Sequence, residues 1–241
     1  MKDLNLIELT NLEKRYGKKE ALAGINLTIG RGKIIGLLGP NGSGKTTLIK
    51  LLNGLLQPTS GEIKVNGKAP GIDSKKIISY LPDKMYFADW MKISDLMDFF
   101  EDFYEDFDRK KAEGMCETLK INTEAKIKSL SKGNKEKVQL VLVMCRKALL
   151  DEPIAGVDPA ARDFILDTIL NNYNEEGTVI ISTHLIADIE KIMDEVIFIK
   201  EGNIVTYKSA DDLREESGKS IDALFREIFH TDVYRGGDEA C

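Results

Sequence analysis

An eight-residue segment, GPNGSGKT at 39–46, constrains the fold of this chain more than any other part of it. The apolar run IIGLL at 34–38 precedes this segment and the helix-like stretch 47–56 follows it, which predicts a strand, a tight loop and a helix in that order. Glycines let successive backbone N–H groups turn inward around a polyphosphate, at the positive end of the helix. Lys45 can then reach the β- and γ-phosphates, and the Thr46 hydroxyl can bind Mg²⁺. A glycine-rich turn that binds nothing would leave the Lys-Thr pair unexplained.

The composition favours one substantial domain and excludes several classes of protein. The chain has 241 residues, 42% of them hydrophobic, enough for one core with a small lobe attached. Its net charge is −6 and its 34 lysines and arginines are scattered, which argues against nucleic acid as a partner. No apolar run approaches the ~20 residues that cross a bilayer, and the charged start MKD is not a signal peptide, so we expect a cytoplasmic chain. Cys116, Cys145 and Cys241 lack close spacing, which indicates neither disulfides nor a zinc site.

Hydrophobic periodicity divides the chain into strand-rich and helical parts. Short β-like pieces and turns alternate over 4–38, as in a meander that leads into the loop. Apolar residues at helical spacing over 94–107 predict an amphipathic helix, with Ser94 as its N-cap, that opens a helical region reaching 146. The acidic face of that helix is either a docking surface or simply a solvated face. Strand-like runs return at 148–150, 178–182 and 195–200 between helix-like segments, which predicts a parallel α/β sheet, and the tail 209–229 suggests one or two helices.

Two further segments point to hydrolysis of a bound nucleotide. LLDEP at 149–153 places two carboxylates at the end of an apolar run, where Asp151 can hold Mg²⁺ through water and Glu152 can polarise an attacking water. LSKGN at 130–134 begins a helix, with Ser131 free to cap it and the Gly133 N–H free to face an anion. Taken alone, the second segment is an ordinary helix N-terminus.

The order of these motifs resembles the nucleotide-binding subunit of an ATP-binding cassette (ABC) transporter. The loop at 39–46, LSKGN, LLDEP, GVDP at 156–159 and IISTH at 180–184 occur as in that family, over nearly the whole chain. YLPD at 80–83 and the lysine inside LSKGN are most similar to bacterial subunits that energise a separate permease of the ABC-2 type. The resemblance implies an α/β fold, a P-loop NTPase (RecA-like) core with an N-terminal β-subdomain and a helical ABC-specific lobe. It also implies a single domain over 1–241, with the core at 1–82 and 148–208, the helical lobe at 83–147 and a short helical tail at 209–241.

The resemblance implies a role for each matching position. Tyr16 would stack on adenine, although a tyrosine beside a turn can also be a plain strand residue. Ser131 and Gly133 would contact the γ-phosphate of an ATP held by a second cassette, packed head to tail. Asp158 would lie in the loop that links the two sites. His184 would sense the γ-phosphate and align the attacking water, whereas the other histidine, in the tail at 230, would be uninvolved.

Together, the motifs and the resemblance define a complete candidate site for ATP and Mg²⁺. The expected catalytic residues are Lys45, Asp83, Glu152 and His184. The expected ligands of Mg²⁺ are Thr46, Asp83 and Asp151. The expected nucleotide contacts are Tyr16, Gly39, Pro40, Asn41, Gly42, Ser43, Gly44, Lys45, Thr46, Thr47, Ser131, Gly133 and Asp158.

Three departures from the family pattern limit what the resemblance carries over. Asp83 stands where glutamine is usual; a carboxylate can still bind Mg²⁺, but it is shorter and charged. Lys132 stands where glycine is usual, and it could add positive charge near a phosphate. Between Arg146 and Leu149 a helix must end, turn and become a strand, which leaves about three residues of strand where ~5 are typical. We therefore expect either a shortened central strand or about three residues missing from the sequence there.

The function that the resemblance implies is that of an ATPase motor subunit. Two cassettes, identical or paralogous, would close on two ATP molecules, and hydrolysis would reopen them. The movement would pass to separate membrane-spanning permease subunits through a groove near 83–93, at the cytoplasmic face of the membrane. An alternative is a soluble ABC ATPase that acts on a macromolecular partner, and a small-molecule kinase would predict neither LSKGN nor the histidine at 184.

Overall fold

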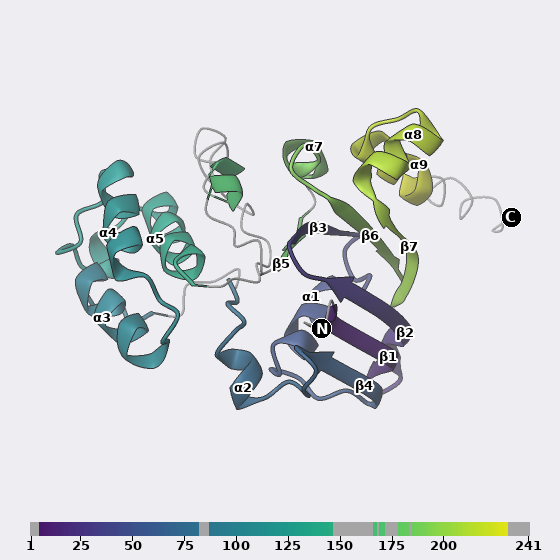
Figure 1. Ribbon diagram of the computed structural model, residues 1–241, viewed down its shortest axis with the longest axis horizontal. Coiled ribbons are helices and arrows are strands. Elements are labelled where there is room, and N and C mark those ends of the chain that lie inside the picture. The colour runs from purple at the N-terminus through teal and green to yellow at the C-terminus, as the bar shows by residue number, and fades with distance from the viewer. Residues whose placement is uncertain are drawn as a thin grey trace, which may run out of the picture.

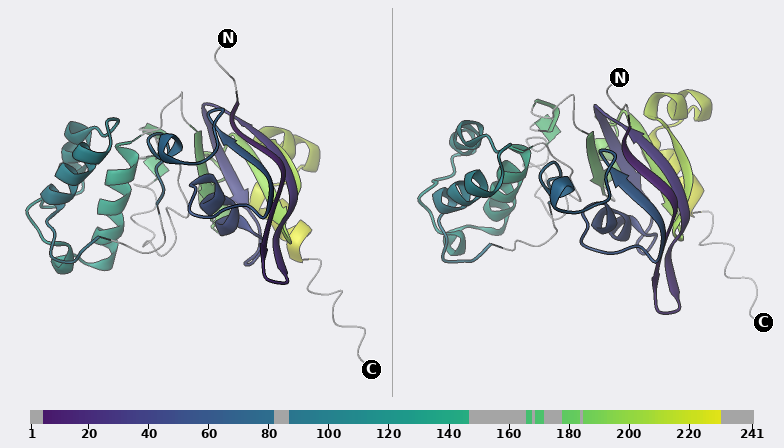
Figure 2. Two further views of the ribbon diagram at one scale, coloured as in Figure 1. Left: turned by 90° about the horizontal axis from the view of Figure 1, so that it is seen from below. Right: turned by 60° about the horizontal axis from the view of Figure 1, so that its bottom comes forward.

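The computed structural model describes residues 5–81, 87–146, 166–167, 169–171, 178–183 and 185–230. Two β-sheets lie beside each other, and a lobe of helices stands to one side of them (Figure 1). Both further views show the same separation between the lobe and the sheets (Figure 2). This arrangement agrees with the predicted core, β-subdomain and helical lobe.

The first sheet is antiparallel and has the strand order β2-β1-β4. Its strands are β1 Asn5–Tyr16, β2 Lys19–Gly30 and β4 Ser60–Val65. Gly17, at a φ of 59°, makes the tight turn between β1 and β2 and confirms the predicted turn there. The predicted meander does not continue to the loop, because β3 belongs to the second sheet. Alternate residues Ile25, Leu27 and Ile29 of β2 are buried in a cluster that also includes the apolar face of α1, Lys45–Leu52. The first sheet therefore covers the helix that follows the phosphate loop.

The second sheet has the strand order β5-β3-β6-β7. Its strands are β5 Thr178–Ser182, β3 Lys33–Leu38, β6 Glu195–Lys200 and β7 Asn203–Ser209. The strand β3 is parallel to β5 and β6, which confirms the predicted parallel sheet, and β7 is antiparallel at the edge. Ile35 and Leu37 of β3 join the cluster around α1, whereas Ile34 and Leu38 join a cluster on the other face. Both faces of β3 are thus covered, as expected for a central parallel strand. The strand predicted at 148–150 lies outside the described residues.

The helical lobe has its own hydrophobic core. It consists of α3 Ile93–Phe103, α4 Arg109–Thr118, a short 3-10 helix Ile127–Ser129 and α5 Lys132–Met144. The predicted N-cap at Ser94 is wrong, because α3 begins at Ile93 with Lys92 as its N-cap. The carboxylate of Asp95 accepts a hydrogen bond from the Lys92 N–H at 2.9 Å, and this contact fixes the start of the helix. The helix also ends before the predicted position, at Phe103.

Outside the lobe and besides α1, the structure gives the bounds of four short helices. They are α2 Ile72–Lys75, α7 Ile186–Ile189, α8 Ala210–Ser217 and α9 Ile221–His230. The rings of Phe225 and Phe229 in α9 lie 6.0 and 5.8 Å from the ring of Phe198 in β6, so the tail covers one face of the second sheet. Among the helices described here, none has the length and apolar character needed to cross a membrane.

Candidate nucleotide-binding site

The phosphate loop joins the end of β3 to the start of α1, as predicted. Gly44 occupies the N-cap of α1 at a φ of 114°, a conformation that residues with a side chain rarely adopt. A β-carbon on Gly39 would lie 2.2 Å from the carbonyl oxygen of Ile199, and Gly42 has a φ of 81°. The three glycines are therefore required by space and by backbone conformation, and the loop runs close to the sheet.

Lys45 directs its ammonium group back over the loop. Its side chain is only 8% exposed, and Nζ donates hydrogen bonds to the carbonyl oxygens of Gly39 at 2.7 Å and Pro40 at 3.1 Å. The positive charge thus lies inside the turn that the backbone makes before α1. An anion at this turn would meet both the ammonium and the N-terminus of α1.

A cavity of about 340 Å³ lies beside the loop and contains Tyr16 from the first sheet. It is lined by Tyr16, Lys19, Ala21, Asn41, Gly42, Gly44, Lys45, Thr46 and Thr47. Tyr16 is 48% exposed, and the Lys14 ammonium lies 5.4 Å from the centre of its ring. The structure therefore brings an exposed aromatic face and the phosphate loop to one cavity, although they are far apart in the sequence.

Two residues of this cavity, Lys19 and Ala21, were not predicted from the sequence. Lys19 is paired with Tyr16 directly across the β1–β2 turn. Because residues that face each other across a tight antiparallel turn are neighbours in space, the turn at 16–19 contained the signal that could have found Lys19.

The described donors fit a polyphosphate. Ser43 Oγ is buried and has no hydrogen-bond partner among the residues that the structure describes, and Thr46 lines the cavity. An unpaired buried hydroxyl is costly, so a polar ligand at the loop would offset that cost. For Mg²⁺, the Thr46 hydroxyl is the one predicted ligand within the described ranges. No group of three or more histidine, cysteine, aspartate or glutamate side chains there is arranged to hold a metal.

Ser131 forms the N-cap of α5, as predicted. Its Oγ accepts a hydrogen bond from the Asn134 N–H at 3.3 Å, and Ser131 is exposed. Gly133 has open space where a side chain would stand. The side chain of Lys132 is 80% exposed and its ammonium lies 3.8 Å from the carboxylate of Glu136. The unusual lysine is thus accommodated at the surface and does not displace Ser131 or Gly133.

Five predicted site residues lie outside the described residues. They are Asp83, Asp151, Glu152, Asp158 and His184. The sequence predicts a shortened or incomplete segment between Arg146 and Leu149. Of that segment, only Arg146 belongs to the described residues. Ser131 and Gly133 do not line the cavity that contains Lys45. Within the described part of one chain, the two halves of the predicted site are therefore separate.

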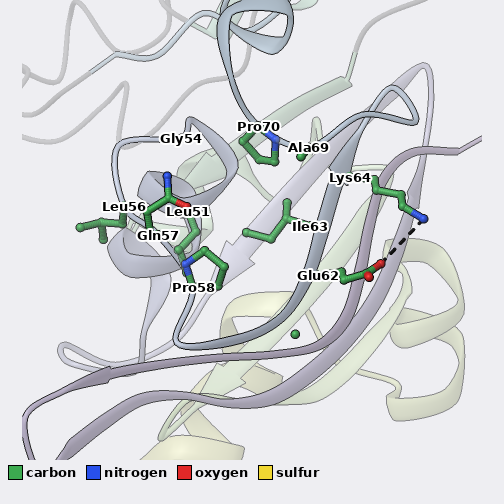
Figure 3. Close-up of a pocket in the computed structure, with 11 residues that line it drawn as sticks. Leu51, Gly54, Leu56, Gln57, Pro58, Glu62, Ile63, Lys64, Ala69 and Pro70 are labelled. Carbon is green, nitrogen blue, oxygen red and sulfur yellow. Dashed lines mark ion pairs between the residues drawn. The ribbon is translucent and has the colours of Figure 1, made fainter.

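A second cavity, of about 370 Å³, lies between the end of α1 and β4 (Figure 3). Leu51, Pro58, Ile63 and Pro70 contribute apolar surface, and Glu62 and Lys64 form an ion pair of 3.8 Å on β4. No residue of the candidate site lines this cavity. It is a separate feature of the β-subdomain.

Comparisons with known proteins identify the family. The family model described as ABC transporter matches residues 22–155. The ABC transporter ATP-binding protein YtrB of Bacillus subtilis is 32% identical, over 95% of this chain and 78% of its own. The SkfA peptide export ATP-binding protein SkfE of the same organism is 30% identical, over 84% of this chain and 88% of its own. An uncharacterized ABC transporter ATP-binding protein of Methanocaldococcus jannaschii, MJ1023, is 34% identical, over 86% and 79% of the two chains.

Solved structures agree with this assignment. A structure titled as the ATP binding subunit of an ABC transporter superposes with a TM-score of 0.83 at 24% identity, over 92% of this chain and 98% of the other. The structure of cbiO1 from Clostridium perfringens, titled as part of the ABC transporter complex cbiONQ, gives a TM-score of 0.74 at 28% identity, over 89% and 92%.

A phosphate loop between a central parallel strand and its helix, with an aromatic residue of an antiparallel sheet in the same cavity, is typical of a P-loop NTPase. The chain belongs to the ABC transporter family, as an ATP-binding subunit that hydrolyses ATP. The resemblance to the nucleotide-binding subunit of an ABC transporter is confirmed.

Proposed function

We propose that two cassettes pack head to tail and enclose two ATP molecules between the phosphate loop of one and Ser131 and Gly133 of the other. The observation that supports this dimer is the separation of the two halves of the site. Ser131 is exposed at the start of α5 and does not line the cavity of its own chain. A second chain, identical or paralogous, would supply the missing half.

The chemistry in such a dimer is transfer of the γ-phosphoryl group to water. Lys45 neutralises charge on the β- and γ-phosphates, and Glu152 accepts a proton from the attacking water. His184 donates a hydrogen bond that holds this water and the γ-phosphate in line. Thr46, Asp83 and Asp151 would hold Mg²⁺, which supplies further charge neutralisation on the phosphates.

The nucleotide would lie across the cavity beside the phosphate loop. Tyr16 would stack on adenine, and the backbone of 39–44 would surround the phosphates, with Thr46 and Thr47 at the start of α1. Asp158 would lie at the interface between the two sites. The division of the single domain into a core at 1–82 and 148–208, a helical lobe at 83–147 and a tail at 209–241 belongs to the same proposal.

The partner in the membrane would be a separate permease of the ABC-2 type, which supports a location at the cytoplasmic face of the membrane. Relatives with transporter names support such a partner, and one of them is named for peptide export. The segment 83–93, between the core and the lobe, would carry the movement to the permease.

Co-fractionation tests the choice between a permease and a soluble partner. A tagged chain, expressed with its native neighbours, is expected to sediment with membranes and to leave them when the permease gene is deleted. Recovery in the soluble fraction in both strains, with a macromolecule bound, would support the alternative of a soluble ABC ATPase.

A further inference from the structure

Arg146 follows α5 directly and lies almost completely inside the protein. Its side chain is 3% exposed. On the lobe side, Nε forms an ion pair of 3.0 Å with the carboxylate of Asp106, and the guanidinium stacks 3.5 Å above the ring of Tyr104. These contacts attach Arg146 firmly to the segment between α3 and α4.

The remaining nitrogens of Arg146 bind the backbone of the core. Nη2 donates to the carbonyl oxygens of Lys76 at 2.9 Å and Lys75 at 3.3 Å, and Nη1 donates to that of Ile78 at 3.3 Å. The acceptors are 68 to 71 residues away in the sequence. This stretch of backbone leads from α2 towards the predicted site residue Asp83. The side chain of Arg146 therefore bonds to both the lobe and the core.

The apolar contacts of α5 allow more freedom than these hydrogen bonds. Val141 and Leu142 belong to the cluster of the lobe, whereas Leu140 and Val143 belong to the cluster of the second sheet, together with Leu81. Apolar packing is not directional, so it permits small tilts of the helix. A guanidinium that bonds a carboxylate and several carbonyls at once fixes the orientation of α5 relative to the core. A lysine cannot reproduce this planar set of donors.

Arg146 lies near one end of α5 and Ser131 at the other, so a tilt of the helix at Arg146 displaces Ser131. The helix α5 has 13 residues, with Ser131 at its N-cap, and Arg146 lies two residues beyond its other end. Such a helix is about 20 Å long, so a tilt of about 10° at the Arg146 end moves Ser131 by roughly 3.5 Å. That shift is longer than a hydrogen bond.

We propose that Arg146 is a positioning residue for the shared ATP site: it sets the angle of α5 against the core, and so places Ser131 opposite the ATP of the partner cassette. This inference rests on the proposed head-to-tail dimer. Arg146 does not line the cavity beside Lys45. Loss of its contacts should therefore impair closure of the dimer and leave the binding of ATP to one chain unchanged.

The test compares Arg146→Met and Arg146→Lys with a matched control, Arg109→Met, each in the Glu152→Gln background. Arg109 also forms ion pairs with carboxylates, those of Asp98, Glu101 and Glu113, but all of them lie within α3 and α4. Binding of ATP to the monomer is measured by equilibrium titration without Mg²⁺. Closure is measured as the Mg-ATP concentration that gives half-maximal dimer in sedimentation, and circular dichroism verifies folding.

We expect all variants to bind ATP within about twofold of the parent, because the phosphate loop is unchanged. Arg146→Met should need at least about tenfold more Mg-ATP for half-maximal dimer, the scale of losing charge-assisted hydrogen bonds. The Mg-ATP concentration that Arg146→Lys needs should lie between those of Arg146→Met and the parent. Arg109→Met should need the same concentration as the parent. If Arg146→Met does not fold, Arg146→Lys, which retains the charge beside Asp106, decides the question by the same comparison.

Two results would overturn the inference, and they are distinguishable. Equal dimer formation by the Arg146 variants and the parent would reject the role of Arg146 and leave the proposed dimer intact. Absence of a dimer in the parent itself, with ATP binding intact, would reject a dimer of two identical chains, and with it the role of Arg146 in that dimer.

Discussion

Gly44 in the phosphate loop lies against Ala21 in β2, so closely that a β-carbon on the glycine would stand 2.7 Å from the alanine carbonyl oxygen. The same β-carbon would lie 2.9 Å from Cδ2 of Leu22. Because Ala21 also lines the cavity beside the loop, this contact joins the first sheet to the phosphate loop. Tyr16, which pairs with Lys19 across the β1–β2 turn, lines the same cavity.

Gly44→Ala is therefore expected to destabilise the protein more than Gly42→Ala. Gly42 has a φ of 81° but open space around it, so alanine there should cost about 1–2 kcal/mol of backbone strain. At Gly44 the collision adds roughly 1–3 kcal/mol to a similar strain. Urea unfolding of both variants gives the comparison. Equal losses of unfolding free energy would show that the contact with Ala21 is relieved without cost.

Tyr16→Ala should weaken binding of ATP, whereas Tyr16→Phe should not. Stacking of a base on an aromatic ring contributes about 1–3 kcal/mol, so we expect a loss of affinity of roughly 5- to 150-fold. Trp90→Ala is the matched control, since Trp90 is an exposed aromatic residue that does not line the cavity. Calorimetric titration with ATP measures all three affinities. An unchanged affinity of Tyr16→Ala would mean that Tyr16 is a plain strand residue.

Ser131→Ala and Ser209→Ala separate a capping role from a role in the shared site. Both serines are helix N-caps with similar hydrogen bonds, of 3.3 Å to the Asn134 N–H and 3.2 Å to the Asp212 N–H. Each variant should lose about 0.5–1 kcal/mol of unfolding free energy. Only Ser131→Ala should also reduce ATP hydrolysis at constant protein concentration, by at least about tenfold. If both variants hydrolyse ATP equally, Ser131 is a cap and nothing more.

Alkaline pH should destabilise the protein through Cys116 and Cys145, which are buried. Burial raises the pKa of Cys116 to about 11 and that of Cys145 to about 12, from an ordinary value of 9.0. Well below pH 9 both thiols are protonated in the folded and the unfolded chain, so their contribution is fully present. Above pH 9 the unfolded chain loses these protons first, and the stability falls until the folded pKa values are passed.

Replacing one thiol isolates this effect from that of other groups that titrate above pH 9. Cys145→Ala should lose less unfolding free energy between pH 9 and pH 11 than the unchanged protein, by up to about 1.4 kcal/mol per pH unit. Denaturant unfolding at several pH values measures both slopes. Identical slopes would contradict the effect of burial on Cys145.

The sequence predicted those features that short motifs encode. The phosphate loop, its flanking strand and helix, and the cap at Ser131 each depend on neighbouring residues, and the structure confirms their order and the cap. The helix, predicted over 47–56, spans Lys45–Leu52. The start of α3 was misplaced because Asp95, the third residue of the helix, fixes its N-terminus, and no serine caps it. Asp95 reaches back to the Lys92 N–H, while the N–H of Ser94 donates to the Thr123 carbonyl oxygen at 2.9 Å.

Contacts between distant segments could not be predicted in this way. Nothing around Arg146 in the sequence indicates that it binds the carbonyl oxygens of Lys75, Lys76 and Ile78, since backbone acceptors carry no residue signal. Ala21 likewise enters the cavity only because the first sheet folds against the loop. Such positions depend on how the elements pack, which periodicity alone does not determine.

The central claim is that two chains share each ATP site. Sedimentation of the Glu152→Gln protein with and without Mg-ATP tests it most directly, because this change should block activation of water and spare binding. A shift from monomer to dimer on addition of Mg-ATP is the predicted result. A monomer at every Mg-ATP concentration, with nucleotide binding intact, would contradict closure of two identical chains.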